Sequence, residues 1–171
     1  VIETRKPGHE FVAPATLFTK LNYESWCSLR WQTWPDDEKQ AISAYLRALW
    51  KAVLNSNPED LPWDGAYGWI EGIAQAEHDL SQYLHEWLEA SSVNAHRNLA
   101  SMILNHNPTN IKRPAGGFWE GHREQWEQLV AWARLPVVRQ KLTDGLDRWG
   151  GEPFANEFLE AAVLLPSDPQ G

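Results

Sequence analysis

The sequence predicts an all-α protein, and three observations support that prediction. Apolar residues recur every three or four positions along most of the chain after residue 34, which is the spacing of one buried face on an α-helix. Proline and glycine interrupt these stripes at intervals typical of helix ends. No stretch alternates apolar and polar residues between turn residues, as a half-buried strand would.

The first predicted helix covers residues 34–54. Pro35 suits the first turn, where its missing N–H is not needed, and the acidic run 36–38 complements the positive end of the helix dipole. Asn55 and Pro58 end the helix, because Asn tolerates a left-handed cap and the residue before a proline is pushed out of the helical region. The expected buried stripe is Ile42, Tyr45, Leu46, Leu49, Trp50, Val53 and Leu54.

A second helix is predicted at about residues 66–89. Its apolar stripe consists of Ile73, Ala76, Leu80, Tyr83, Leu84 and Trp87. A polar stripe with the same spacing consists of Glu71, Gln75, His78, Gln82, His85 and Glu89. Because both stripes keep their spacing throughout, the pattern predicts one continuous helix, with Gly72 as the place where a break would be expected.

Four further helices are predicted downstream. Ser91 or Ser92 is the expected N-cap of a third helix, whose buried side carries Leu99, Met102, Ile103 and Leu104. The apolar face of the fourth consists of Trp119, His122, Trp126, Leu129, Val130 and Ala133. Pro136 and Pro153 each open another helix, separated by the glycines at 150–151. The fifth helix buries Val138, Leu142, Leu146 and Trp149.

Length and composition bound the protein class. The 171 residues fit one domain, which we expect at 34–166, between a poorly patterned N-terminal segment with short helices at 1–33 and a tail at 167–171. With 43% hydrophobic and 22% charged residues the chain is typical of soluble globular proteins. The start has neither an apolar signal region nor an initiator Met, so we expect no signal peptide and a piece of a longer protein.

The net charge of −8 disfavours binding to nucleic acid or to an anionic membrane surface, and favours a protein partner with a basic surface. Cys27 is the single cysteine, which excludes an internal disulfide and favours a cytoplasmic setting. No apolar run approaches the roughly 18–20 residues that span a bilayer. The composition leaves the oligomeric state open.

One phrase occurs twice, as LNSNPEDL at 54–61 and as LNHNPTNI at 104–111, fifty positions apart. The match extends into the neighbouring helices, since Leu49 corresponds to Leu99 and Trp69 to Trp119. In period and pattern, two helices around an Asn-Pro turn resemble HEAT-like helical repeats, although no motif of a particular family is present. We therefore expect antiparallel helix pairs stacked as a short HEAT-like repeat. The alternative is an irregular compact helical bundle in which two helices end by the same capping chemistry.

The eleven tryptophans divide into two groups. Four lie on predicted apolar faces and are expected in the core, namely Trp50, Trp87, Trp126 and Trp149. Four others lie at helix ends or in weakly patterned segments, where exposure is more common: Trp26, Trp31, Trp34 and Trp63. Aromatic and polar residues of this kind form the predicted partner-binding surface, which consists of Trp31, Trp34, Trp63, Glu71, His78, His85 and Glu89.

The sequence predicts no catalytic residue, no cofactor and no metal site. His78 and His85 share a predicted helix face, but seven residues separate them by about 10.5 Å, too far for both to bind one zinc ion. His96 lies on an apolar face, where a hydrogen-bonded core histidine is expected. Phosphate-binding loops and nucleophile elbows are absent from the sequence.

Three functions remain after these exclusions. The pattern favours a non-enzymatic helical-repeat module for protein–protein interaction or scaffolding, as one domain of a larger protein. A small acidic inhibitor or immunity-type protein that binds a basic partner is the alternative. An enzyme whose site is assembled from residues far apart in sequence is the second alternative.

Overall fold

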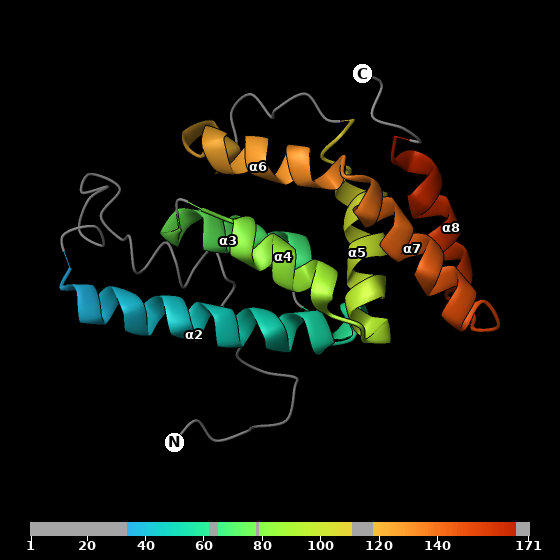
Figure 1. Ribbon diagram of the computed structural model, residues 1–171, viewed down its shortest axis with the longest axis horizontal. Coiled ribbons are helices and arrows are strands. Elements are labelled where there is room, and N and C mark those ends of the chain that lie inside the picture. The colour runs from blue at the N-terminus through green and yellow to red at the C-terminus, as the bar shows by residue number, and fades with distance from the viewer. Residues whose placement is uncertain (1–33, 62–64, 78, 111–117, 167–171) are drawn as a thin grey trace.

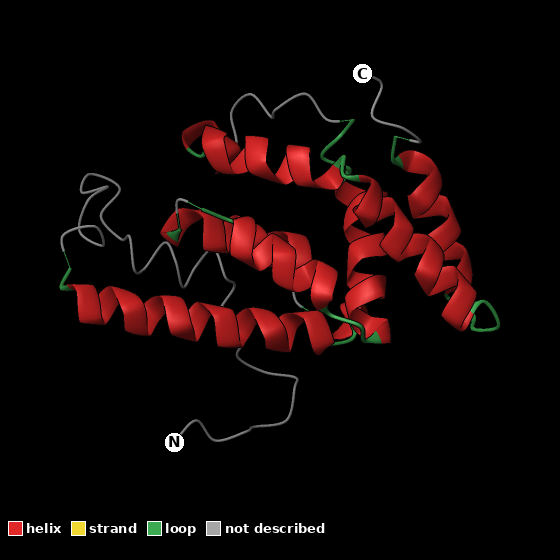
Figure 2. Cartoon of the chain, viewed as in Figure 1, coloured by secondary structure: helices red, strands yellow, loops and turns green. Residues whose placement is uncertain are grey.

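The structure is a computed structural model that describes residues 34–61, 65–77, 79–110 and 118–166. All regular secondary structure in these ranges is helical (Figure 2), which confirms the predicted fold class for this part of the chain. The elements in chain order are α2 (Asp36–Asn55), η2 (Pro58–Asp60), α3 (Gly65–Ala76), α4 (Ser81–Glu89), α5 (Val93–His106), η3 (Phe118–Gly121), α6 (Arg123–Ala133), α7 (Pro136–Trp149) and α8 (Ala155–Leu164). None of the described helices has the length and apolar character that a bilayer crossing requires.

The middle of the fold is α5. It contacts α2 and α3 on one side and the α7–α8 hairpin on the other, while α4 and α6 contact each other (Figure 1). Half of its residues are buried: Ala95, His96, Asn98, Leu99, Ala100, Met102 and Ile103. The packing therefore gives one continuous core around α5.

This arrangement does not confirm HEAT-like stacking. The two helices that end in the repeated phrase, α2 and α5, cross each other in Figure 1 instead of running parallel. In the first unit α3 packs against α2, whereas in the second unit α6 packs against α4. Trp69 lies within α3, but its counterpart Trp119 lies in the η3 turn before α6. The local similarity of the two turns is thus not accompanied by equivalent packing.

The prediction of one helix at 66–89 is wrong, because the chain breaks into α3 and α4. Side chains of α6 satisfy the backbone at the break. The N–H of Leu80 donates to Oε1 of Gln128 at 2.7 Å, and Nε2 of Gln125 donates to the carbonyl of Glu77 at 3.3 Å. These bonds from α6 replace backbone hydrogen bonds that are lost where the helix breaks, between Ala76 and Ser81. The break does not fall at Gly72, which is buried within α3.

The first turns of α5 cap the C-terminus of α2. Nδ2 of Asn98 donates to the carbonyls of Val53 (3.3 Å) and Ser56 (3.0 Å), and Nδ2 of Asn94 donates to the carbonyl of Asn55 (2.8 Å). The carbonyl of Val53 also accepts the backbone N–H of Ser56 at 3.0 Å, so the amides of α5 add to the bonds at this helix end and fix α2 against α5.

Arg97 holds the turn after α2. Its guanidinium donates to Oδ1 of Asn57 at 2.8 Å and to Oε1 of Glu59 at 2.7 Å, and it stacks 4.5 Å above the ring of Phe154 at the start of α8. The side chain of Glu59 is exposed, and the bond from Arg97 is the largest effect that lowers the pKa of its carboxyl group. One arginine thereby connects η2, α5 and α8.

Two other helix ends are capped in the same way. Nδ2 of Asn107 donates to the carbonyl of Leu164 at the end of α8 (3.2 Å). Nζ of Lys141, on α7, donates to the carbonyls of Leu88 (3.1 Å) and Ala90 (2.5 Å) at the end of α4. A cation at a helix C-terminus also interacts favourably with the helix dipole.

Tryptophans fill the centre of the core. The ring of Trp87 contacts that of Trp50 edge-on at 5.2 Å and stacks on that of Trp132 at 5.4 Å. Nε1 of Trp50 and Nε1 of Trp87 donate to backbone carbonyls, so neither indole N–H group is buried without a hydrogen-bond partner. Core positions are confirmed for Leu46, Val53, Leu84, Leu99, Ile103, Leu142, Trp50, Trp87 and Trp126.

Some expected core positions are corrected. Leu49 and Trp149 are only partly buried, and Tyr45 is exposed.

Ser92 is the N-cap of α5, and its Oγ accepts the N–H of Ala95 at 3.2 Å, as the sequence predicts. The last helix starts at Ala155, two residues after the expected proline.

Candidate functional site

The structure describes four of the seven residues of the predicted partner-binding surface. Trp31, Trp63 and His78 lie outside the described residues. The other four are Trp34, half-buried before α2, Glu71, half-buried on α3, and the exposed α4 residues His85 and Glu89. The break between α3 and α4 separates Glu71 from the other two helix residues. Only His85 and Glu89 share a helix face, and their role in binding stays a prediction.

Negative charge is concentrated in the first half of the fold. Between residues 34 and 110 the sequence has eleven Asp and Glu side chains and four Lys and Arg side chains. The exposed acidic residues of α2, η2 and α4 with its preceding loop are Asp36, Asp37, Glu38, Glu59, Asp60, Asp79 and Glu89. This half of the molecule therefore attracts cations and basic surfaces.

A polar contact at Glu77 joins α2 to the start of α4. Its Oε1 accepts hydrogen bonds from Oγ of Ser43 (2.6 Å) and from the hydroxyl of Tyr83 (3.2 Å). Burial, followed by the negative charge of Glu77, raises the pKa of Tyr83, so this hydroxyl stays protonated and donates. A carboxylate is a weak base toward a serine hydroxyl, which favours a structural role for this contact over activation of Ser43.

A buried histidine, His96 on α5, packs against α7 and α8. Nδ1 of His96 is 2.9 Å from the carbonyl of Ser92, and its ring packs edge-on against Trp149 and Phe158. This confirms the expected hydrogen-bonded core histidine. Burial lowers its pKa, so the ring is favoured in the neutral form. Gly145 permits the close approach of α7, because a Cβ there would lie 3.2 Å from Cδ2 of His96.

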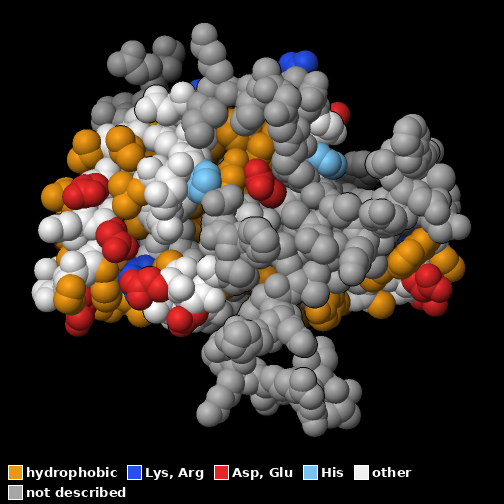
Figure 3. Space-filling view, turned by 180° about the vertical axis from the view of Figure 1, so that it is seen from behind, with side chains coloured by type: hydrophobic (Ala, Val, Ile, Leu, Met, Phe, Trp, Pro, Cys, Tyr) orange, Lys and Arg blue, Asp and Glu red, His pale blue; other side chains and the backbone are white. Residues whose placement is uncertain are grey.

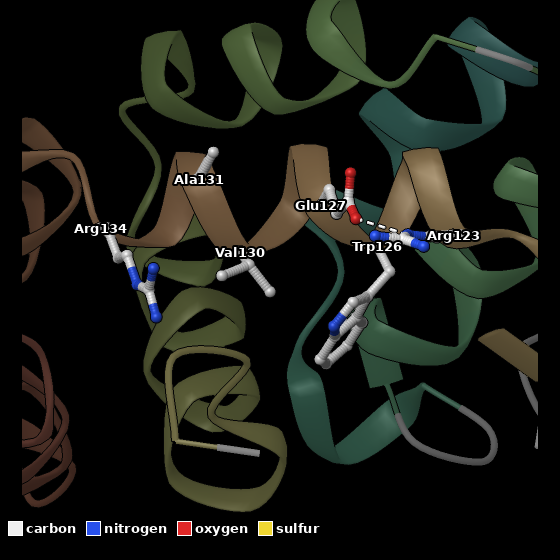
Figure 4. A pocket seen from close by; sticks show the side chains of 6 residues that line it. All are labelled: Arg123, Trp126, Glu127, Val130, Ala131 and Arg134. Atoms are coloured by element: carbon white, nitrogen blue, oxygen red, sulfur yellow. Dashed lines mark hydrogen bonds and ion pairs between the residues drawn. The ribbon is translucent and has the colours of Figure 1, made fainter. Parts of the chain in front are cut away.

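An open groove of about 550 Å³ follows the outer surface of α6. We call its lining the α6 face, which consists of Arg123, Trp126, Glu127, Val130, Ala131 and Arg134. The two arginines lie at opposite ends of the labelled segment, while Trp126 and Val130 point to the same side of the helix (Figure 4). Nε of Arg123 donates to Oε1 of Glu127 at 2.7 Å.

Two exposed apolar side chains follow α6 in the chain, Leu135 at the N-cap of α7 and Val137 in its first turn. Leu135 retains 45% and Val137 49% of its accessible surface. A second exposed set lies on the outer side of α8, with Leu159, Val163 and Leu164. In Figure 3 orange side chains are scattered among red ones over the α7–α8 end of the molecule. Leu135 differs from that set because it directly follows Arg134, which lines the groove.

The sequence contained a partial signal for the α6 face. Arg123, Glu127, Val130 and Arg134 follow the four-three-four spacing of one side of a helix. Val130 was expected in the core, but it lies at the boundary between the buried stripe and the groove. Whether such a boundary residue is covered depends on which neighbours pack there.

Among the described residues, no group of three or more His, Cys, Asp or Glu side chains lies close enough together to hold a metal ion. Comparison with known proteins gives no family model, no curated protein and no solved structure that matches this chain.

Proposed function

We propose that the protein is a non-enzymatic helical module, one domain of a larger protein, that binds another protein through the α6 face. The observation that carries this proposal is the open groove on α6, together with the exposed Leu135 and Val137 that follow α6 in the chain. Apolar side chains beside a groove are surfaces that protein partners commonly cover. The proposal does not depend on HEAT-like stacking.

The inner side of α6 supports a preorganised binding surface. Leu129, Trp132 and Ala133 are buried, and Gln125 and Gln128 bond to the break between α3 and α4. A helix fixed on its inner side loses little conformational freedom when a partner covers its outer side.

The test is affinity capture from cell extract with matched variants. The double variant Leu135→Asp/Val137→Asp places charges at the two exposed apolar positions that follow α6, and Val163→Asp places one on the outer side of α8, as a control at a more exposed position. We expect the wild type and the α8 variant to retain the same partner, and the double variant to lose it. Far-UV circular dichroism and melting curves verify that all three proteins are folded. Retention of that partner by the folded double variant would rule out the α6 face.

The second candidate is a small acidic inhibitor or immunity-type protein that binds a basic partner. The observation that favours it is the excess of eleven acidic over four basic residues between 34 and 110. Such a complex associates faster at low ionic strength, because exposed charges beyond roughly 10 Å are screened at 0.1 M salt. The variant Asp79→Lys/Glu89→Lys should slow association with a captured partner, whereas Leu135→Asp/Val137→Asp should not. The opposite pattern supports the first proposal.

A further inference from the structure

We propose that the α6 face receives an amphipathic α-helix of the partner protein whose acidic side chains are spaced to meet Arg123 and Arg134. This inference rests on the proposed function and adds the kind of partner to it. It is carried by the charges at the ends of the groove, by the small apolar residues between them, and by the helical backbone of the described chain.

The arginines define the charge of the partner. Arg123 and Arg134 are eleven residues apart, which is about 16 Å along a helix, or three turns. Arg123 is paired with Glu127, but both side chains are exposed, so this ion pair is weak and can exchange for a partner carboxylate. The side chain of Arg134 is exposed, and its guanidinium makes no hydrogen bond or ion pair within the described part of the chain. Each guanidinium can bind one carboxylate through two parallel hydrogen bonds.

The centre of the face defines the shape of the partner. Ala131 is small and exposed, and Val130 is half-buried beside it. Small side chains at a contact let two helices approach to an axial distance of about 8–10 Å. Leu135 and Val137, which follow Arg134 in the chain, are exposed apolar side chains available to an apolar stripe on the partner.

A helical partner fits this surface better than an extended one. The backbone of α6 is hydrogen-bonded within the helix, and the described residues contain no strand whose edge could pair with a peptide. An extended segment lying on Val130 and Ala131 would leave its own backbone N–H and C=O groups without partners. A helix satisfies these groups internally and needs only side-chain contacts.

The same charges disfavour a polyanion as the ligand. Nucleic acid carries a charge at every phosphate, so the net charge of −8 would repel it along its whole length, whereas a helix with two carboxylates can place them on the two arginines. Two isolated guanidinium groups with Glu127 between them match separate carboxylates better than a continuous run of phosphates.

The experiment is a selection from a phage-displayed library of amphipathic helical peptides of about 18 residues, with all non-apolar positions randomised. The full chain is the target, and the variant Val130→Glu/Arg134→Glu is the counter-target. Val163→Glu, on α8, is the folded control. Binding of the selected peptides is measured by fluorescence anisotropy at low and at moderate salt.

We expect selected peptides to be acidic, with carboxylates about three turns apart, and to bind the Val163→Glu protein like the wild type. Arg134→Glu should weaken binding by about tenfold or more, and a peptide whose matching carboxylate is replaced by Lys should recover it. Recovery by the charge-swapped peptide identifies the pair, which a loss through misfolding cannot imitate.

Basic peptides, or peptides that bind the counter-target equally well, would overturn this inference. So would the absence of any binder. If the α6 face still retains its partner in affinity capture, the proposed function stands and only the helical acidic partner is wrong. If capture is also insensitive to Leu135→Asp/Val137→Asp, both proposals fail.

Discussion

Lys141 provides the sharpest test of the packing between α4 and α7. The side chain is 7% exposed, and its ammonium group donates to the carbonyls of Leu88 and Ala90. Burial lowers the pKa of Lys141 to about 8, with a further decrease from Arg148 that Asp144 and Glu89 oppose. In the unfolded chain the pKa returns to about 10.4. The folded and unfolded states therefore bind different numbers of protons between these two values.

The direction of the pH dependence follows from proton binding. Between about pH 8 and pH 10.4 the unfolded chain keeps the proton of Lys141 and the folded chain releases it, so raising the pH favours the folded state. Each unit of pKa difference corresponds to about 1.4 kcal/mol, which gives on the order of 3 kcal/mol over the whole window. Below pH 8 both states are protonated and this contribution no longer changes.

The perturbation is Lys141→Met, which keeps most of the side-chain volume and removes the titrating group. Urea denaturation of both proteins at several values between pH 7 and pH 10.5 gives the free energy of unfolding. We expect the wild type to gain stability relative to the variant by on the order of 3 kcal/mol from pH 8 to pH 10.5. The raised pKa of Tyr83 lowers stability at the upper end of this range, but it does so in both proteins and cancels in the difference.

A constant difference between the two proteins across this range would refute the reasoning. It would mean that Lys141 is solvated in the folded state, and that α7 does not bury it against the end of α4. The absolute stability of the variant at one pH is less informative, because the methionine also leaves two carbonyl acceptors without a donor.

The other predictions concern the core and the helix caps. Leu99→Ala should lower the free energy of unfolding by about 2–5 kcal/mol, and Leu49→Ala by only about 1 kcal/mol, because Leu99 is fully buried and Leu49 is not. Equal losses in urea denaturation would show that the inner side of α2 is misassigned. Asn98→Ala should cost about 1–3 kcal/mol, since it removes the buried amide that bonds to the carbonyls of Val53 and Ser56 and joins α5 to the end of α2. Asn105→Ala is the matched control, because its exposed amide bonds only within α5, and similar losses from both variants would contradict the capping role.

The break at residues 77–80 shows where prediction from the sequence fails. Both helical stripes continue through it, so local periodicity favours an unbroken helix. The break is stabilised by Gln125 and Gln128, which are 48 residues further along the chain. A local pattern contains no information about such partners. The consequence for the candidate site is direct, because a polar stripe predicted as one surface is divided between two helices.

The repeated phrase illustrates the same limit. Asn57 and Asn107 occupy matching places after α2 and α5, but Asn57 accepts a hydrogen bond from Arg97, whereas Asn107 donates to the end of α8. Asn and Pro are common after helix ends in any surroundings, so similar turns require no similar surroundings. Packing around α5 then places the two turns in different environments.

The sequence by itself determined the all-helical class of the described chain, most helix ends and most of the core. These features depend on residues a few positions apart: Oγ of Ser92 caps its own helix, and Pro136 begins one because the first helical position needs no N–H. Only the tertiary structure decided which helices touch, where the second predicted helix breaks, and that the outer side of α6 forms a groove. Those outcomes depend on side chains such as Asn98, Gln128 and Lys141 that satisfy backbone groups of helices distant in sequence. Which distant groups meet is set by the packing of the whole core, and no local pattern encodes it.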